Sequence, residues 1–93
     1  MPVLEPYQIN LTPPAVRSLT RLAPKFADAA LRFIDGPLAE NPLRVTKPLR
    51  GEFEDLRSGY VGTSYRVLVR VDNDERIVHV VAIAHRADVY RPR

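Results

Sequence analysis

The sequence predicts an α+β domain in which a two-helix hairpin packs on one face of a small, mostly antiparallel β-sheet. Three observations support this fold class. An alternating segment comes first, two segments with apolar stripes follow it, and the second half of the chain holds further alternating or continuously apolar segments. The expected order is strand, helix, helix and three strands, in one domain spanning residues 1–93.

The first strand and the start of the first helix are predicted over residues 6–13. Apolar residues alternate with polar ones over residues 6–11, which is typical of a strand. Thr12 can cap the helix that follows, and Pro13 suits its first position, where no backbone N–H is needed.

Two amphipathic helices, separated at Pro24, are predicted to form a hairpin with one apolar side. The second helix runs from Lys25 to about Ile34, and Gly36 with Pro37 is expected to end it. The stripe residues are Ala15, Leu19 and Leu22 in the first helix and Phe26, Ala30 and Phe33 in the second.

The second half is predicted to contain a proline-rich ordered connection and then a sheet. The connection covers residues 36–51, and the strand candidates are a weak one over 52–58, one over 64–72 and one over 76–86. Asn73 and Asp74 are expected to form a two-residue hairpin turn. The last strand is apolar at nearly every position, as expected of a central strand covered on both faces.

Composition excludes several classes of protein. A chain of 93 residues can bury one small core. The absence of cysteine excludes a disulfide framework, a cysteine-ligated metal and thiol catalysis. No apolar run reaches the roughly 20 residues of a membrane helix, and the segment MPVLEPYQINL does not resemble a secretory signal. These features predict a cytoplasmic protein.

The net charge of +3 comes from the second half of the chain. Residues 1–43 carry four basic and four acidic side chains, whereas residues 44–93 carry ten basic and seven acidic ones. Arginine outnumbers lysine twelve to two, a bias that a GC-rich genome would also produce. Because guanidinium groups match phosphate oxygens well, the distribution points to nucleic acid as a partner.

Common catalytic motifs are absent from the sequence. It contains no Walker A segment, no G-x-G-x-x-G, no HExxH and no G-x-S-x-G. His79 and His85 are six residues apart on one predicted strand, which is a poor basis for a metal site, and His79 is interpreted as a half-buried strand residue. No metal or cofactor is expected.

Two arginines of the strand over residues 64–72 are the first candidates for function. Arg66 and Arg70 share a face opposite the valine stripe of that strand. With a two-residue turn, His85 lies on the Arg66 face, whereas a one-residue bulge brings Arg86 beside Arg66 instead. Both registers are possible at this point. Each arginine could also be a solvated surface residue whose stem covers apolar surface.

Five segments form a set that covers nearly the whole chain. They are Y-x-I-x-L-T-P-P-A-V-R-S-L (7–19), G-P-L-A-E-N-P (36–42), K-P-L-R-G (47–51), Y-R-V-L (65–68) and H-R-A-D-V-Y-R (85–91). As a set they resemble the RelE toxins of the RelE/ParE toxin–antitoxin superfamily. The resemblance implies the same β-α-α-β-β-β fold and an mRNA endonuclease that acts in the ribosomal A site. It also implies a RelB-like antitoxin that binds the toxin in a hetero-oligomer.

The chemistry implied by the resemblance is attack of a ribose 2′-OH on the adjacent phosphate without a metal. Arg66 would hold that phosphate, Arg86 would stabilise charge, and Tyr90 would stack on a base or transfer a proton. His85 stands where a proton donor would be useful. The candidates for contact with RNA or the ribosome are Lys47, Arg50, Arg57, Tyr60 and Arg70.

The segment RSGYVGTS, residues 57–64, departs from the family pattern. Related sequences usually carry two or more basic residues here, whereas this chain has only Arg57. Reduced activity is therefore one expectation, with Arg57 and Tyr60 as substitutes. Two other functions stay open: a ParE-like inhibitor of DNA gyrase, and a weakened toxin-fold protein that acts as an antitoxin-binding or co-repressor subunit. Arg66 and the H-R-x-D-V-Y-R ending favour the nuclease.

Overall fold

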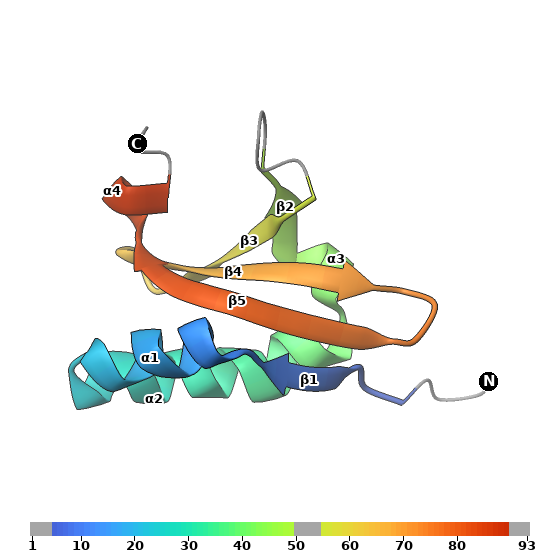
Figure 1. The fold of residues 1–93 in the computed structure, drawn as a ribbon, viewed down its shortest axis with the longest axis horizontal. Coiled ribbons are helices and arrows are strands. Elements are labelled where there is room, and N and C mark those ends of the chain that lie inside the picture. Colours follow the sequence, from blue (N-terminus) through green and yellow to red (C-terminus); the bar gives the residue numbers. More distant parts are fainter. Residues whose placement is uncertain (1–4, 50–54, 90–93) are drawn as a thin grey trace.

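The sheet of this protein has five strands, and two helices cover one of its faces (Figure 1). The computed structural model describes residues 5–49 and 55–89. In chain order the elements are β1 (Gln8–Leu11), α1 (Pro13–Arg21), α2 (Pro24–Phe33), a π-helical turn (Ile34–Leu38), α3 (Pro42–Val45), β2 (Thr46–Pro48), β3 (Arg57–Val61), β4 (Tyr65–Asp72), β5 (Ile77–His85) and α4 (Arg86–Val89). The α+β class and the helix hairpin are as the sequence predicts.

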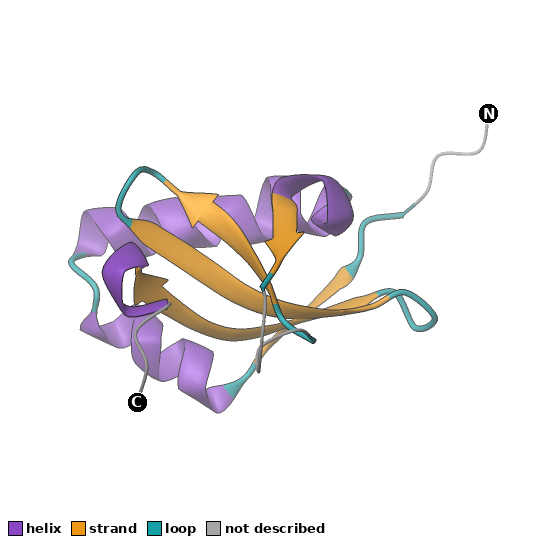
Figure 2. Ribbon diagram, turned by 90° about the horizontal axis from the view of Figure 1, so that it is seen from above, coloured by secondary structure: helices purple, strands orange, loops and turns teal. Residues whose placement is uncertain are grey.

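The strands lie in the order β1-β5-β4-β3-β2. The pair β1–β5 is parallel, and the other three pairs are antiparallel. Helices α1 and α2 lie against one face, whereas α4 lies on the opposite side at the end of β5 (Figures 1 and 2). The α1–α2 hairpin therefore leaves the second face of the sheet uncovered, and this second face is called the open face below.

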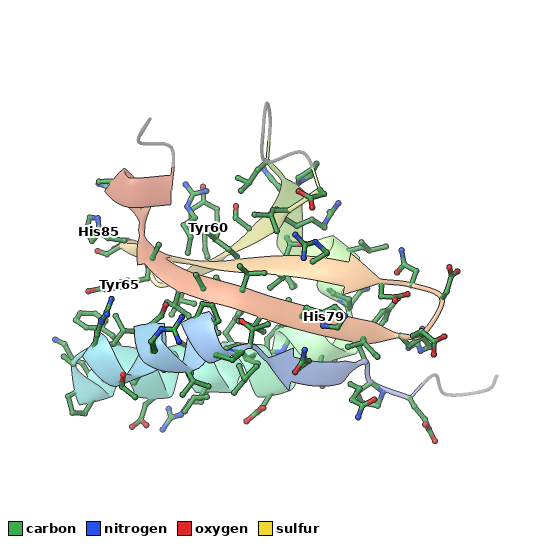
Figure 3. All side chains as sticks on the ribbon, in the orientation of Figure 1. Tyr60, Tyr65, His79 and His85 are labelled. Atoms are coloured by element: carbon green, nitrogen blue, oxygen red, sulfur yellow. The ribbon has the colours of Figure 1, made fainter. Side chains whose placement is uncertain are left out.

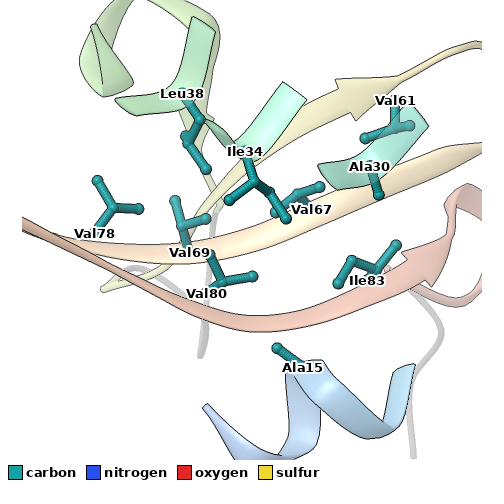
Figure 4. Packing of buried hydrophobic residues seen from close by; sticks show 10 residues of the cluster. All are labelled: Ala15, Ala30, Ile34, Leu38, Val61, Val67, Val69, Val78, Val80 and Ile83. Atoms are coloured by element: carbon teal, nitrogen blue, oxygen red, sulfur yellow. The ribbon is translucent and has the colours of Figure 1, made fainter. Parts of the chain in front are cut away.

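The core fills the space between the sheet and the α1–α2 hairpin (Figure 4). Ala15 and Ala30 are both 0% exposed, and their small side chains let the helices approach the strands closely. The strands contribute the buried residues Val61, Val67, Val69, Val78, Val80 and Ile83, and the π-helical turn contributes Ile34 and Leu38. Because these residues point toward the helices, their strand neighbours point to the open face.

The last strand differs from its prediction, because only one of its faces is fully covered. On that face Val78, Val80 and Ile83 are buried. Ile77 and His79 on the other face are only half-buried. The continuous apolar run therefore does not mark a strand buried on both faces.

A bulge at Val81 decides which residues of β5 share a face. Leu68 pairs with Ala82 but Val69 pairs with Val80, so Val81 is skipped in the ladder. Thr12 is not the side-chain cap of α1 that its position suggests. Its hydroxyl instead donates to the carbonyl of Val80 at 2.7 Å. The side chain that precedes α1 thus ties the helix to the bulged part of β5.

The loop between β4 and β5 is longer than the predicted two-residue turn. Asp72 pairs with Ile77, which leaves four residues, 73–76, in the loop. The carboxylate of Asp72 accepts the backbone N–H groups of Asp74 and Glu75 at 3.1 and 3.0 Å, forming an Asx turn. Compared with the predicted turn, the loop is longer by two residues, an even number, so the residues at the start of β5 keep their predicted faces. Only the bulge moves the later residues of β5 to the opposite face.

The connection over residues 36–51 is more structured than predicted. Gly36 and Pro37 do not end the helical segment, because a π-helical turn carries the chain past them. The predicted loop also contains α3 and the edge strand β2, and the weak strand predicted over 52–58 corresponds to β3, which begins at Arg57. None of the helices in the described part of the chain has the length and apolar character needed to cross a membrane.

Gly59 allows the close approach of α2 to β3. A Cβ at this position would lie 2.8 Å from Cζ of Phe33 and 3.1 Å from the carbonyl oxygen of Val45. We expect Gly59→Ala to lower the free energy of unfolding by about 1–3 kcal/mol, because the added methyl group would collide with Phe33 and Val45. Urea denaturation measures this change. Gly36→Ala is the matched control, since a Cβ there meets nothing within 4 Å. A similar loss in both variants would mean that packing against Phe33 is not the cause.

Candidate functional site

The open face of the sheet gathers the polar side chains that strand alternation directs away from the helices. Tyr60 on β3 pairs directly with Arg66 on β4. Lys47 on β2 pairs with Ser58, which in turn pairs with Leu68. Lys47, Tyr60 and Arg66 therefore point to the same side of three adjacent strands. Tyr60 is visible on this side in Figure 3, away from α1 and α2.

These side chains line a cleft of about 320 Å³. Its lining residues are Arg44, Val45, Lys47, Pro48, Ser58, Tyr60 and Arg66. Three cationic groups thus converge from α3, β2 and β4, and none of the seven lining residues that belong to the described part of the chain is acidic. A site of this composition attracts phosphate groups.

The guanidinium of Arg66 lies over the ring of Tyr60, with Cζ at 4.1 Å from the ring centroid. This distance is within the range of a cation–π contact. Tyr60 itself is 55% exposed. The arginine therefore sits against an aromatic ring at the open surface of the cleft.

Arg86 is held at the same end of the sheet as Arg66. The bulge at Val81 makes Ala84 the partner of Arg66, and Arg86 follows two residues later as the first residue of α4. Its backbone N–H donates to the carbonyl of Ser64 at 2.7 Å. Of the two registers that the sequence allows, the structure therefore has the bulged one.

His85 lies on the helix side of the sheet, as a result of the same bulge. It pairs with Tyr65, and the two rings meet edge to face with centroids 5.6 Å apart. The ring of Tyr65 also packs against the ring of Phe26 in α2, with the two centroids 5.0 Å apart. Nδ1 of His85 accepts the backbone N–H of Ala87 at 3.2 Å. The histidine thus supports the junction of β5 and α4, and its pairing position is on the face opposite Arg66.

Arg57 and Arg70 lie outside the cleft. Arg57 is on the helix side, where its guanidinium donates to Oγ1 and the carbonyl of Thr46 at 2.8 and 2.9 Å and to the carbonyl of Leu43 at 3.2 Å. Arg70 is on the open face and forms an exposed ion pair with Asp55 at 2.9 Å. Arg57 therefore joins β3 to α3 and β2, which is a structural role.

Arg50 and Tyr90 lie outside the described residues. His79 is half-buried, as predicted, and its Nδ1 is 2.9 Å from the side-chain amide of Asn10. Within residues 5–49 and 55–89, no group of three or more His, Asp or Glu side chains is arranged to hold a metal ion.

Comparison with known proteins places this arrangement in a family. The sequence model described as "ParE toxin of type II toxin-antitoxin system, parDE" matches residues 9–90. The chain belongs to the RelE/ParE family of type II toxins. Toxin RelG and Toxin RelE of Mycobacterium tuberculosis are each 42% identical to it over 86 residues. The matched residues are 92% of this chain, 98% of RelG and 88% of RelE.

A solved structure also resembles this toxin. The toxin–antitoxin complex RelBE2 from Mycobacterium tuberculosis contains a chain that is 38% identical and superimposes with a TM-score of 0.82. The match covers 87% of the toxin described here and 99% of that chain.

Arg44 is a cationic lining residue of the toxin's cleft that could not be singled out from the sequence. Arg44 belongs to the proline-rich connection over residues 36–51, for which the sequence predicts no helix or strand. The one available signal was its spacing, since Arg44 precedes Lys47 by three residues. The short helix α3 and strand β2 bring both cations to the cleft.

The structural role of Arg57 in the toxin predicts a clear difference in stability between two arginine variants. Arg57→Ala is expected to lower the free energy of unfolding by about 1–3 kcal/mol, because it leaves acceptors of Thr46 and Leu43 without their donor. Arg70→Ala is expected to change it by less than about 1 kcal/mol, because its ion pair is exposed. Urea denaturation of both proteins measures the difference, and equal stabilities would contradict the structural role.

Proposed function

We propose that this toxin is a ribosome-dependent endonuclease that cuts mRNA in the A site. The observation that carries the proposal is the cleft in which Arg66 lies beside Tyr60, with Arg44 and Lys47 among its other lining residues. Such a cleft can hold the phosphates of a single RNA strand. The similarity to mycobacterial toxins named RelE and RelG supports the same function.

In the proposed reaction the ribose 2′-oxygen attacks the adjacent phosphorus. A bond forms between the 2′-oxygen and phosphorus, and the bond between phosphorus and the 5′-oxygen breaks. The 2′ proton leaves with the help of a base, and the 5′-oxygen receives a proton. Arg66 stabilises the negative charge that develops on the phosphate oxygens, and Arg86, at the same end of the sheet, adds to this stabilisation.

Other residues of the site divide into binding and proton-transfer roles. Lys47 and Arg44 hold phosphates or ribosomal RNA beside the scissile bond. Tyr90 remains the candidate for base stacking or proton transfer, and Arg50 for a ribosome contact, although both lie outside the described residues. We leave His85 out of the chemical step because it pairs with Tyr65 on the helix side.

Residues 57–64 carry fewer basic side chains than the family pattern, and other elements of the fold supply cations beside them. Within that segment Ser58 and Tyr60 face the cleft, and neither carries a positive charge. Arg44 and Lys47 provide cations beside them from α3 and β2. We therefore expect the toxin to cut mRNA despite this departure from the family pattern.

A RelB-like antitoxin is the proposed protein partner. The solved chain that is 38% identical belongs to a toxin–antitoxin complex. The cleft offers three cations to an acidic segment of such a partner, which would fold as it binds. Binding there would neutralise the toxin by covering the cleft.

The proposal is tested by adding the purified toxin to a cell-free bacterial translation reaction. Primer extension then maps the new 5′ ends of the mRNA, with a ribosome-free reaction and Arg66→Ala beside it. We expect ends at A-site codons that depend on both ribosomes and Arg66. Intact mRNA in the complete reaction would refute the nuclease.

Inhibition of DNA gyrase is the second candidate function, because the matching family model describes a ParE toxin. A gyrase supercoiling assay with the same preparation separates the two. Inhibition of supercoiling together with intact mRNA would establish the ParE-like function, whereas cleaved mRNA with normal supercoiling would exclude it.

A further inference from the structure

We infer that Tyr60 is a positioning residue, whose ring holds the Arg66 guanidinium in place for the scissile phosphate. This inference rests on the proposed nuclease function and deepens it. It assigns Tyr60 a role different from stacking on a base, which is the role its exposure alone would suggest.

The contact has a defined geometric origin. Tyr60 and Arg66 are direct cross-strand partners on β3 and β4, so their Cβ atoms lie side by side on the open face. The guanidinium carbon is 4.1 Å from the ring centroid. Two rigid strands therefore set the distance, and the ring restricts the rotamers of an otherwise flexible side chain.

An aromatic ring holds an arginine without neutralising it. Arg70 is held by the carboxylate of Asp55, which cancels much of its charge. Arg66 contacts the ring of Tyr60, which carries no charge. This contact orients the guanidinium and adds no negative charge beside it. Such preorganised charge lowers the barrier of a reaction in which negative charge develops.

The chain contains a matched control for the stacking itself. Arg76 lies over the ring of Tyr7, with its guanidinium carbon 4.2 Å from the centroid. This pair joins the N-terminal segment to the β4–β5 loop, and Tyr7 also donates a hydrogen bond to Asn73. Tyr7→Leu therefore removes an equivalent stack outside the cleft.

The experiment compares Tyr60→Phe, Tyr60→Leu and Tyr7→Leu with the native toxin by two measurements. NMR follows the side-chain protons of Arg66, which we expect to be shifted upfield by the ring current of Tyr60. Reconstituted ribosome complexes give the rate constant of cleavage at saturating ribosome concentration and the ribosome concentration that gives half of this rate.

We expect Tyr60→Phe to keep both the upfield shift and the cleavage rate. Tyr60→Leu should lose the shift and cleave about three- to tenfold more slowly at saturation, with little change in the half-saturating concentration. Tyr7→Leu should leave the Arg66 shift and the cleavage rate unchanged. In the Arg66→Ala background, Tyr60→Leu should cause no further loss, because Tyr60 acts through Arg66.

Three results would overturn the inference. An unchanged Arg66 shift in Tyr60→Leu would show that the ring does not hold the guanidinium in solution. A lost shift with native cleavage would show that the position of Arg66 does not depend on the ring. A raised half-saturating concentration that persists in the Arg66→Ala background would assign Tyr60 to base stacking. If the native toxin cleaves nothing, the nuclease proposal fails, whereas the NMR measurement still decides whether the stack exists.

Discussion

Arg66→Ala is expected to lower the rate of A-site cleavage by about 100- to 1,000-fold, because it removes a preorganised charge from the reacting phosphate. Folding should be little affected, because Arg66 is only half-buried on the open face of β4. Substitutions at such strand positions lower the free energy of unfolding by about 1 kcal/mol. Single-turnover cleavage of ribosome-bound mRNA measures the rate, and circular dichroism checks the fold.

Arg70→Ala is the matched control for this prediction. Arg70 is on the same strand and the same face, four residues away, but it is paired with Asp55 and does not line the cleft. It should cleave at close to the native rate. Native cleavage by Arg66→Ala, or equal losses in the two variants, would remove Arg66 from the chemical step.

Val80→Asp is expected to prevent folding altogether. Val80 is 0% exposed on the interior strand β5, within the cluster that packs against α1 and α2 (Figure 4). A carboxylate there would be buried without a partner, at a cost that exceeds the stability of a small domain. Circular dichroism and size-exclusion chromatography measure the outcome.

Val16→Asp tests whether burial is the reason for this effect. Val16 is on α1 and is 45% exposed, so a carboxylate there stays in water. This variant should fold with a stability close to native. A soluble, folded Val80→Asp protein would contradict the position of β5 at the centre of the core.

The main elements could be predicted from sequence because their patterns are local. The alternation in β1 and β4 and the apolar stripes of the two helices each follow from one stretch of chain. The π-helical turn could not be predicted in this way, because Gly36 and Pro37 normally end or interrupt helices. Tertiary packing overrides that preference here, since Ile34 and Leu38 anchor the turn in the core. Helix α3 has only four residues, too few to show a helical pattern.

The site was predictable in its residue types but not in its grouping. Arg66 could be placed on a strand face from alternation, whereas the bulge at Val81 has no local sequence signal and lies beside a contact with Thr12 from the other end of the chain. Because of that bulge, His85 lies on the helix side of the sheet, and Arg86 lies at the same end of the sheet as Arg66. Likewise, Arg57 could be recognised as structural only when Thr46 and Leu43 were placed beside it.

The end groups of the cleaved mRNA test the proposed chemistry most directly. The toxin would be incubated with ribosomes that hold one defined mRNA, and both fragments would be analysed by mass spectrometry. Attack by the 2′-oxygen predicts a 2′,3′-cyclic phosphate on the upstream fragment and a 5′-hydroxyl on the downstream fragment. A 5′-phosphate with a free 3′-hydroxyl would show that water is the nucleophile and would contradict the mechanism.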